Sequence, residues 1–221
     1  IAEVLAPKGN HFGTKRSCLD TEYYETFNRD DVTLVDLMRE PIEAIEPSGV
    51  RTSAGGYEFD DLILATGFDA MTGSLLAIDP VGEGGVSLRE AWQAGPYTYL
   101  GVAAHGFPNM FMITGPGSPS VLSNMIVSIE QHVDWVPDLI AHLEARGIDT
   151  VQPVEEAQKR WMQTVHEEAA ATLYLTGNSW YLGANIPGKP RVFMPYVAGV
   201  GKYRAIAEDV AADGYRGFAF A

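Results

Sequence analysis

Two neighbouring cationic side chains, Lys15-Arg16, are the first feature of this sequence that could do chemistry. Arginine offers a fixed planar fork of N–H donors and lysine a mobile point charge, so the pair could hold an anion or stabilise one that forms in a reaction. The 221 residues carry a net charge of −14, which makes the pair a local positive site. A solvated pair on a loop is the commoner meaning of two such neighbours.

Two glycine-containing turns could bind a nucleotide cofactor. Residues 62–65 lead into Thr66-Gly67-Phe68-Asp69, and residues 110–113 lead into a turn at 114–119. Both apolar runs predict strands buried on both faces, and small residues at their ends would let a dinucleotide approach the backbone. The second turn precedes a predicted helix, where free N–H groups could cradle an anion or a flavin edge. An ordinary strand exit and a ligand-free Pro/Gly connection are the alternatives.

Residues 179–190 form a third unusual segment, rich in aromatic residues, Gly, Asn and Pro. The segment has neither a helical nor a strand period and cannot supply a regular core face, so a binding or lid loop is one interpretation. The large apolar ring and single donor of Trp180 suit it to covering a cofactor. The alternative is an irregular packed loop in which Trp180 fills the core.

Short strands and a strand meander are expected ahead of the first glycine turn. The predicted strands are residues 32–35, 42–45, 50–52 and 57–59. The last three are separated by close turns that contain glycine, which predicts antiparallel pairing.

Three helices are expected in the rest of the chain, at about residues 121–145, 153–173 and 199–213. The first has an apolar face with spacings of three and four residues, formed by Ile126, Ile129, Val133, Val136, Ile140 and Leu143. Two histidines of this helix, His132 and His142, are expected to face solvent or to pack on the helix itself.

The composition argues against several classes of partner. A net charge of −14 disfavours nucleic acid, because phosphate binding needs clustered Lys and Arg. Cys18 is the only cysteine and the five histidines form no metal constellation, so we expect neither a disulfide nor a metal site. No apolar run approaches the roughly 20 residues of a membrane-spanning helix. These features fit a cytoplasmic protein that does not bind membranes.

Taken in order, the motifs resemble the C-terminal part of the Baeyer–Villiger monooxygenases, and most closely the phenylacetone monooxygenase branch. The resemblance extends over nearly the whole chain. The residues that carry it are Lys15-Arg16, Asp20, Tyr23-Tyr24, Phe27-Asn28-Arg29-Asp30, Ala65-Thr66-Gly67-Phe68-Asp69, Gly95-Pro96, Phe107-Pro108-Asn109-Met110-Phe111, Gly115-Pro116-Gly117-Ser118-Pro119-Ser120, Ser128-Ile129-Glu130, Ser179-Trp180, Gly183-Ala184-Asn185-Ile186 and Pro187-Gly188-Lys189-Pro190-Arg191-Val192-Phe193-Met194.

The resemblance implies an α/β fold made of the C-terminal parts of two dinucleotide-binding, Rossmann-like domains, with a strand meander followed by helices. Residues 1–14 would leave a helical insertion, residues 15–61 would belong to the NADPH-binding domain, and residues 62–221 to the FAD-binding domain. The implied enzyme uses FAD, NADPH and O₂ to convert a ketone into an ester or lactone through a peroxyflavin. An anion of that kind needs a permanent positive charge in a dry site.

The same resemblance implies roles for individual residues. Arg16 would be the catalytic cation, and Lys15 would pair with the 2′-phosphate of NADPH. The other cofactor-binding residues would be Thr66, Gly67, Phe68, Asp69, Gly115, Pro116, Met125 and Trp180. The substrate pocket would be lined by Ser120, Val121, Leu122, Ser123 and Met125.

Members of the family begin with a Gly-rich FAD fingerprint and later carry a Gly-rich NADPH turn, and neither occurs in this sequence. We therefore expect a fragment whose partner is the missing N-terminal part of the same enzyme, and a chain that is inactive by itself. A related flavin monooxygenase acting on nitrogen or sulfur is one alternative, although it is not expected to share Lys15-Arg16 with the downstream pattern. A truncated, non-catalytic fragment is the other alternative.

Overall fold

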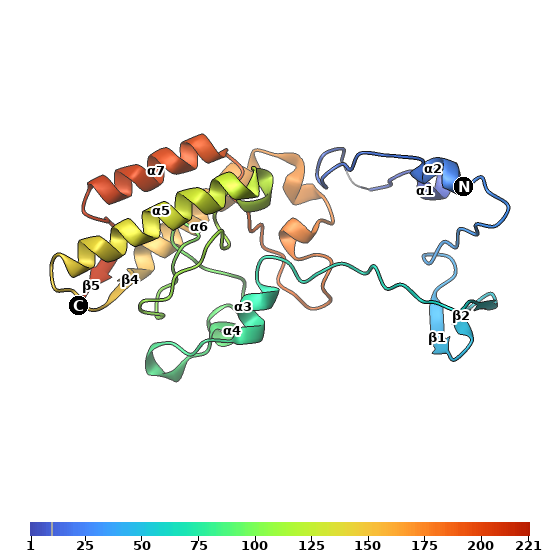
Figure 1. Ribbon diagram of the computed structural model, residues 1–221, viewed down its shortest axis with the longest axis horizontal. Coiled ribbons are helices and arrows are strands. Elements are labelled where there is room, and N and C mark those ends of the chain that lie inside the picture. The colour runs from blue at the N-terminus through green and yellow to red at the C-terminus, as the bar shows by residue number, and fades with distance from the viewer. Residues whose placement is uncertain (10) are drawn as a thin grey trace. The chain divides into compact units, whose positions relative to one another are not determined.

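The computed structural model describes residues 1–9 and 11–221. The chain divides into two compact units, Ile1–Gly67 and Phe68–Ala221, and each is described by itself (Figure 1). Among the described residues, no helix combines the length and apolar character that crossing a membrane requires.

The first unit contains two single-turn helices and a three-stranded sheet. The helices are α1 (Ala2–Leu5) and α2 (Tyr23–Thr26). The strands are β1 (Ile42–Glu46), β2 (Gly49–Thr52) and β3 (Gly56–Glu58). They pair antiparallel in the order β1-β2-β3, with Ile45 opposite Val50 and Val50 opposite Tyr57. The predicted meander is confirmed.

Close approach of the backbone makes Gly49 necessary in this sheet. A Cβ atom at this position would lie 1.9 Å from the carbonyl oxygen of Tyr57, so a larger residue would push β2 and β3 apart. The carboxylate of Glu40 then fastens the two strands, because it accepts hydrogen bonds from Thr52 Oγ1 at 2.5 Å and from Tyr57 Oη at 2.8 Å.

The second unit consists of helices with a two-stranded sheet. Its helices are α3 (Gly73–Ile78), α4 (Leu88–Ala91), α5 (Met125–Glu144), α6 (Glu155–Ala170) and α7 (Val200–Ala212). Its strands, β4 (Val151–Pro153) and β5 (Phe218–Phe220), pair antiparallel. Four short 3-10 helices are η1 (Glu83–Gly85), η2 (Ser120–Leu122), η3 (Leu173–Thr176) and η4 (Trp180–Leu182). The three predicted long helices are thus confirmed, although α5 begins later than expected.

The main core of this unit lies between α5, α6 and α7, of which α5 and α7 run side by side (Figure 1). Leu139 of α5, Val165 of α6 and Tyr203 of α7 are at most 1% exposed. Aromatic rings fill the centre, where Trp161 stacks on Tyr196 with their centroids 5.3 Å apart. Two smaller clusters surround Trp92 and Tyr181.

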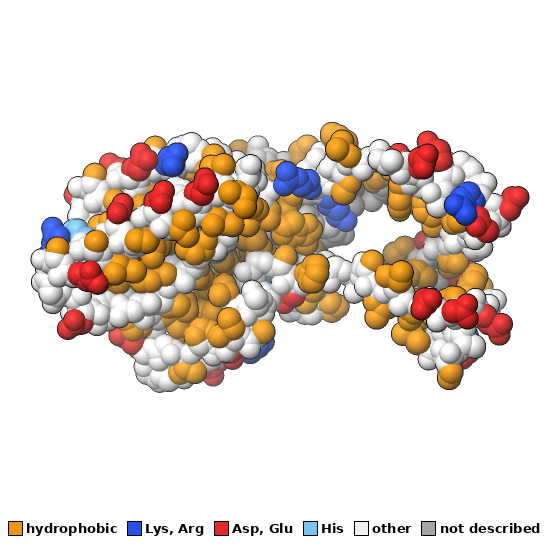
Figure 2. Space-filling model, viewed as in Figure 1, with side chains coloured by type: hydrophobic (Ala, Val, Ile, Leu, Met, Phe, Trp, Pro, Cys, Tyr) orange, Lys and Arg blue, Asp and Glu red, His pale blue; other side chains and the backbone are white. Residues whose placement is uncertain are grey.

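The predicted core face of α5 is wrong for half of its members. Ile126, Val133 and Ile140 are 61%, 45% and 39% exposed. The buried side instead carries Ser128, Gln131, His132, Trp135, Val136, Leu139 and Leu143. The helix has apolar residues on two sides, and the core takes the side with the larger Trp135, on which Ser128 and His132 find internal partners. Figure 2 shows apolar side chains over the exposed side of α5.

Three predicted strands are also wrong. Residues 32–35, 62–65 and 110–113 form no strand, because no strand lies beside any of them within residues 1–9 and 11–221 and an isolated strand cannot satisfy its backbone. The expected burial fails for Ile63 and Leu64, which are 87% and 69% exposed. Met112 is buried, and its N–H donates to the carbonyl of Val102 at 2.8 Å.

A pair of adjacent substitutions tests which side of α5 faces the core. Leu139 is fully buried and Ile140 is 39% exposed. We expect Leu139→Ala to lower the free energy of unfolding by about 2–5 kcal/mol, the cost of a cavity in a packed core. We expect Ile140→Ala to lower it by less than about 1 kcal/mol. Urea denaturation followed by circular dichroism measures both, and equal losses would contradict the observed face.

Candidate functional site

Two motifs that the sequence places more than a hundred residues apart are joined in the second unit. Lys189 forms an ion pair with the carboxylate of Asp69, and its Nζ also donates to the carbonyl of Ala70 at 3.3 Å. Asn185 Nδ2 donates to the carbonyl of Phe68 at 3.0 Å. The Lys189 side chain is only 11% exposed, which strengthens its interaction with Asp69 relative to a surface pair. The glycine-containing segment at 183–189 is thereby fastened to the start of the unit.

The residues of the first glycine turn are open to solvent. Phe68 is 89% exposed, and residues 62–69 are all exposed. Gly67 has a φ of +87°, and a Cβ atom there would meet nothing within 4 Å. Thr66 and Gly67 therefore present an uncovered backbone, as close approach by a planar ligand requires.

The second turn, at residues 114–118, offers few free donors. The N–H of Thr114 donates to His132 Nδ1 at 2.9 Å, and that of Gly115 donates to the carbonyl of Gly101 at 3.1 Å. The N–H groups of Gly117 and Ser118 donate to the carbonyls of Met194 and Gly115 at 2.7 and 3.1 Å. The expectation of a cradle of free N–H groups at these residues is wrong, because the protein itself supplies their acceptors.

Packing explains the glycines of this turn. A Cβ atom on Gly115 would lie 2.7 Å from the carbonyl oxygen of Gly101. A Cβ atom on Gly117 would lie 2.9 Å from Thr98 Oγ1 and 3.0 Å from Trp161 Nε1. Core packing therefore requires glycine at both positions, whether or not a ligand binds this turn.

The predicted substrate-lining residues lie in η2, at the residue that follows it and at the start of α5. Ser120 is buried with a left-handed φ of 42°, and its hydroxyl contacts the sulfur atoms of Met71 and Met125 at 3.5 and 3.7 Å. Ser123 Oγ lies 2.6 Å from Ser128 Oγ. Val121 and Leu122 are half-buried beside the cluster around Tyr181. Met71, itself left-handed with a φ of 66°, joins the turn although no sequence pattern marked it.

Trp180 begins η4 and packs within its own segment. Its ring centroid lies 4.4 Å from that of Tyr181, and the Ser179 hydroxyl caps the turn by accepting from the Tyr181 N–H at 3.3 Å. Trp180 is half-buried, so part of its ring remains open. The role of Trp180 in covering a cofactor therefore stays a prediction.

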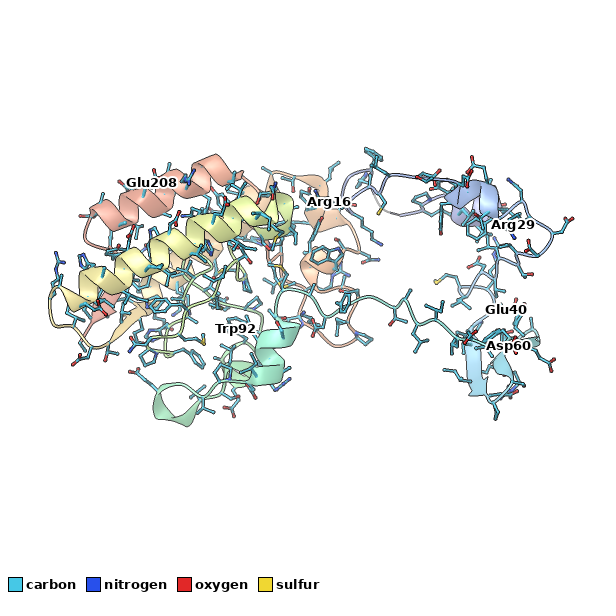
Figure 3. The ribbon with its side chains drawn as sticks, viewed as in Figure 1. Arg16, Arg29, Glu40, Asp60, Trp92 and Glu208 are labelled. Carbon is cyan, nitrogen blue, oxygen red and sulfur yellow. The ribbon has the colours of Figure 1, made fainter. Side chains whose placement is uncertain are left out.

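The cationic pair Lys15-Arg16 lies in the first unit. Both residues are exposed and follow a turn in which Thr14 Oγ1 donates to the carbonyl of His11 at 2.7 Å. Figure 3 labels Arg16. Within residues 1–9 and 11–221, no three His, Cys, Asp or Glu side chains are grouped to hold a metal ion.

A buried polar pair escaped the sequence analysis. His132 was expected to face solvent or to pack on its own helix, but it is fully buried and its partners lie outside α5, with its Nε2 2.7 Å from the hydroxyl of Tyr203. Burial lowers the pKa of His132 from 6.5 to about 4 and raises the pKa of Tyr203. His142 of the same helix is half-buried against Tyr215. The sequence of an amphipathic helix does not indicate whether one of its histidines will form hydrogen bonds inside the core.

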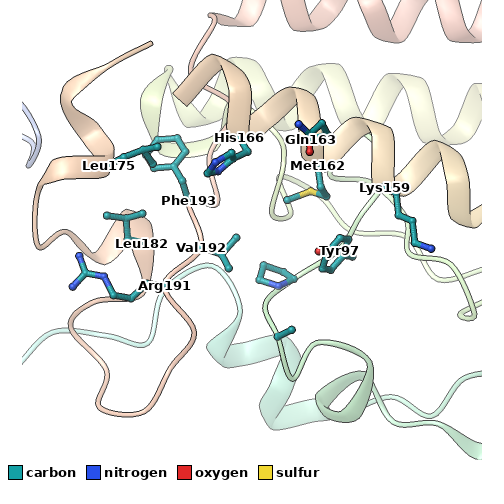
Figure 4. Close-up of a pocket in the computed structure, with 12 residues that line it drawn as sticks. Tyr97, Lys159, Met162, Gln163, His166, Leu175, Leu182, Arg191, Val192 and Phe193 are labelled. Carbon is teal, nitrogen blue, oxygen red and sulfur yellow. The ribbon is translucent and has the colours of Figure 1, made fainter. Parts of the chain in front are cut away.

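A cavity of about 480 Å³ lies beside α6 and includes Tyr97, Met162, His166 and Arg191 in its wall (Figure 4). Another wall residue, Lys159, is paired with Glu155 at 2.7 Å. The Arg191 guanidinium donates to Asn178 Oδ1 at 2.8 Å and to the carbonyl of Gly177 at 3.2 Å. None of the predicted site residues lines this cavity.

Comparison with known proteins gives matches over almost the whole chain, although no family model matches it. A Baeyer–Villiger monooxygenase of Pseudooceanicola batsensis is 43% identical over 97% of this chain and 39% of its own length. The crystal structure of a steroid monooxygenase bound to NADP is 52% identical, with a TM-score of 0.89 over 99% of this chain and 41% of its own. The chain is homologous to Baeyer–Villiger monooxygenases.

A crystal structure of OTEMO in complex with FAD and NADP is 40% identical, with a TM-score of 0.94 over all of this chain and 40% of its own. A phenazine N-monooxygenase of Lysobacter antibioticus is 40% identical over 92% of this chain and 38% of its length. This chain therefore spans about two fifths of the length of the relatives it matches. The mixed α/β fold is confirmed by these structures.

Burial of His132 predicts a specific pH dependence of stability. The pKa is about 4 in the folded chain and 6.5 when the histidine is exposed, so the unfolded chain binds the proton more readily. The stabilisation is complete above pH 6.5 and is lost as the pH falls towards 4, amounting to roughly 3 kcal/mol. Urea unfolding between pH 4 and 7 should show a flatter dependence in His132→Asn. The same slope in both proteins would contradict the burial of a neutral histidine.

Proposed function

We propose that this chain is part of a flavin-dependent Baeyer–Villiger monooxygenase, which converts a ketone and O₂ into an ester or lactone with FAD and NADPH. The observation that carries the proposal is similarity over 97–99% of the chain, at 43–52% identity, to proteins named as Baeyer–Villiger and steroid monooxygenases. The matched region extends over the part of the chain, from Lys15 to Lys189, in which the sequence motifs lie. We place the enzyme in the cytoplasm and give it small-molecule substrates.

The two units are proposed to belong to two Rossmann-like, dinucleotide-binding domains. Residues 15–61 would complete the NADPH-binding domain, residues 62–221 would form part of the FAD-binding domain, and residues 1–14 would leave a helical insertion. The exposed apolar run at residues 62–64 supports this assignment, because such a run is stable when further strands of a domain cover it. Those strands would come from the N-terminal part of the same enzyme.

The residues present fit a planar cofactor by backbone approach rather than by N–H donation. Thr66 and Gly67 present an open backbone, whereas the N–H groups of Gly115 and Gly117 are taken within the protein. We assign FAD contacts to Thr66, Gly67, Phe68, Asp69, Gly115, Pro116 and Met125. We assign NADP contacts to Lys15, which would pair with the 2′-phosphate, and to Trp180, whose ring would cover the cofactor.

Arg16 is proposed to stabilise negative charge during oxygen insertion. FAD, when bound, supplies the activation of O₂. The Arg16 guanidinium is cationic and presents several N–H donors in one plane, so it could stabilise negative charge that develops on oxygen during the reaction. Lysine in its place would keep the charge but lose the planar fork.

The turn at η2 is proposed to form the wall of the ketone pocket. Ser120, Val121, Leu122, Ser123 and Met125 are small or apolar, which leaves room for a bulky apolar substrate. The left-handed φ of Ser120 supports a functional role, since such conformations in non-glycine residues gather at binding sites.

Oxygenation of nitrogen is the second candidate function. The similarity to a phenazine N-monooxygenase, at 40% identity, favours it specifically. The two functions share the cofactors and differ in the acceptor atom, so product analysis separates them. The chain by itself is proposed to be inactive under either function.

Replacement of Arg16 tests the proposed function in the complete enzyme. We expect Arg16→Ala to retain flavin reduction by NADPH but to lose ester formation by at least about 10²-fold, the scale for removal of one oxyanion donor. Oxygen uptake should then yield hydrogen peroxide, and Arg16→Lys should fall between the two. Stopped-flow absorbance of the flavin and product analysis provide the measurement.

The matched control is Arg29→Ala, which removes another exposed arginine of the same unit, paired with Asp31 at 2.6 Å. Ester formation should be unaffected in this variant. A normal ester yield from Arg16→Ala would contradict the catalytic role proposed for Arg16, which would then be a surface cation without a part in the reaction.

A further inference from the structure

One continuous series of hydrogen bonds crosses the core of the second unit. The N–H of Thr114 donates to His132 Nδ1 at 2.9 Å, so Nδ1 carries no proton and Nε2–H donates to the Tyr203 hydroxyl at 2.7 Å. That hydroxyl in turn donates to the carbonyl of Leu100 at 2.5 Å. Every donor in the series is used once, which fixes the direction of each bond.

The two side chains in the middle of this series are completely enclosed. His132 is 0% exposed and Tyr203 is 1% exposed, and their ring centroids are 5.6 Å apart. A buried polar group that loses its partner keeps the cost of its desolvation. Loss of either end bond therefore leaves the Thr114 N–H or the Leu100 carbonyl without this partner, whereas both end bonds can persist without the central one.

Both ends of the series hold strained backbone. Thr114 has a φ of 54° and Leu100 a φ of 55°, values in the left-handed region that side chains other than glycine rarely adopt. Thr114 is also β-branched, which makes this conformation more unfavourable. Residues remain in such conformations only when the surrounding structure holds them there.

The two strained residues belong to segments that lie against each other. The N–H of Met112 donates to the carbonyl of Val102 at 2.8 Å, and the N–H of Gly115 donates to the carbonyl of Gly101 at 3.1 Å. His132 and Tyr203 bridge this pair of segments from α5 and α7. These bonds therefore join the turn at residues 114–118 to α5 and, through Tyr203, to α7.

We propose that His132 and Tyr203 are positioning residues that clamp Thr114 and Leu100 in the left-handed conformation and so place the turn at residues 114–118 for FAD. The role towards FAD rests on the proposed function, whereas the clamp itself rests on the hydrogen bonds and the backbone conformation. Neither side chain touches the cofactor in this proposal.

Two substitutions of His132 separate its bond with Thr114 from its bond with Tyr203. The Oδ1 of asparagine occupies nearly the position of His132 Nδ1, so His132→Asn keeps an acceptor for the Thr114 N–H. The Nε2 of glutamine occupies nearly the position of His132 Nε2, so His132→Gln keeps only the donor towards Tyr203. Tyr203→Phe removes the hydroxyl from both of its bonds.

The chain offers a matched control in Tyr196→Phe. Tyr196 is fully buried with its ring centroid 6.0 Å from that of Tyr203, but its hydroxyl has no hydrogen-bond partner among the residues that the structure describes. Tyr196→Phe therefore removes a tyrosine hydroxyl from the same core without removing any hydrogen bond of the clamp.

Hydrogen exchange of the backbone amides in the full 221-residue chain tests the clamp. We expect the amides of Thr114 and Gly115 to exchange about tenfold faster in His132→Gln and Tyr203→Phe, and at the original rate in His132→Asn and Tyr196→Phe, because local opening follows loss of the bond. Amides of α6 should be unaffected. Unchanged exchange at Thr114, or equal acceleration over α5, α6 and α7, would overturn the clamp. If Tyr203→Phe does not fold, the comparison of the two His132 variants tests the clamp. Exchange at Thr114 that is no faster in His132→Gln than in His132→Asn would overturn it.

The role towards FAD is tested separately in the complete enzyme. His132→Gln should shift the visible absorbance of bound flavin and raise the hydrogen peroxide formed per NADPH several-fold, while His132→Asn and Tyr196→Phe stay close to the original protein. Faster exchange at Thr114 with an unchanged flavin spectrum would overturn the placement of this turn against FAD. Because the exchange result does not depend on the flavin, failure of the proposed function and failure of the clamp give different outcomes.

Discussion

Burial of the polar side of α5 is the constraint on which the second unit depends. A buried histidine needs hydrogen-bond partners, and His132 finds these in Thr114 and Tyr203, whereas Oε1 of the buried Gln131 has no partner among the described residues. The same side carries Leu139, which packs among α6 and α7. One helix thus sets the core and the path of the turn at residues 114–118, while its Ile126 side remains exposed.

The turns that surround the proposed cofactor site are fixed by contacts within the chain. Gly115 and Gly117 allow the backbone to pack against Gly101 and Trp161, and their N–H groups are satisfied internally. Lys189 fastens the other turn by pairing with Asp69. Such preorganisation reduces the cost of ordering loops when a ligand binds, which is the physical value of a rigid site.

The sequence was sufficient to predict the meander and the three long helices, because both depend on local periodicity and turn residues. It could not predict which side of α5 is buried, since both sides carry apolar residues and the choice depends on partners such as Tyr203. The apolar run at 62–65 looked like a buried strand, but burial depends on neighbouring strands, which local sequence does not reveal. Asp69 and Lys189 belong to two separate sequence motifs, and local sequence does not reveal that they form an ion pair.

We propose that the enzyme containing this chain inserts an oxygen atom from O₂ beside a ketone carbonyl. Mass spectrometry of the product formed by the complete enzyme, with NADPH, a bulky apolar ketone and isotopically heavy oxygen gas, tests it most directly. The account predicts an ester or lactone in which one heavy oxygen atom stands beside the original carbonyl. An ester without the heavy atom, or an oxidised amine as the sole product when an amine competes with the ketone, would contradict it.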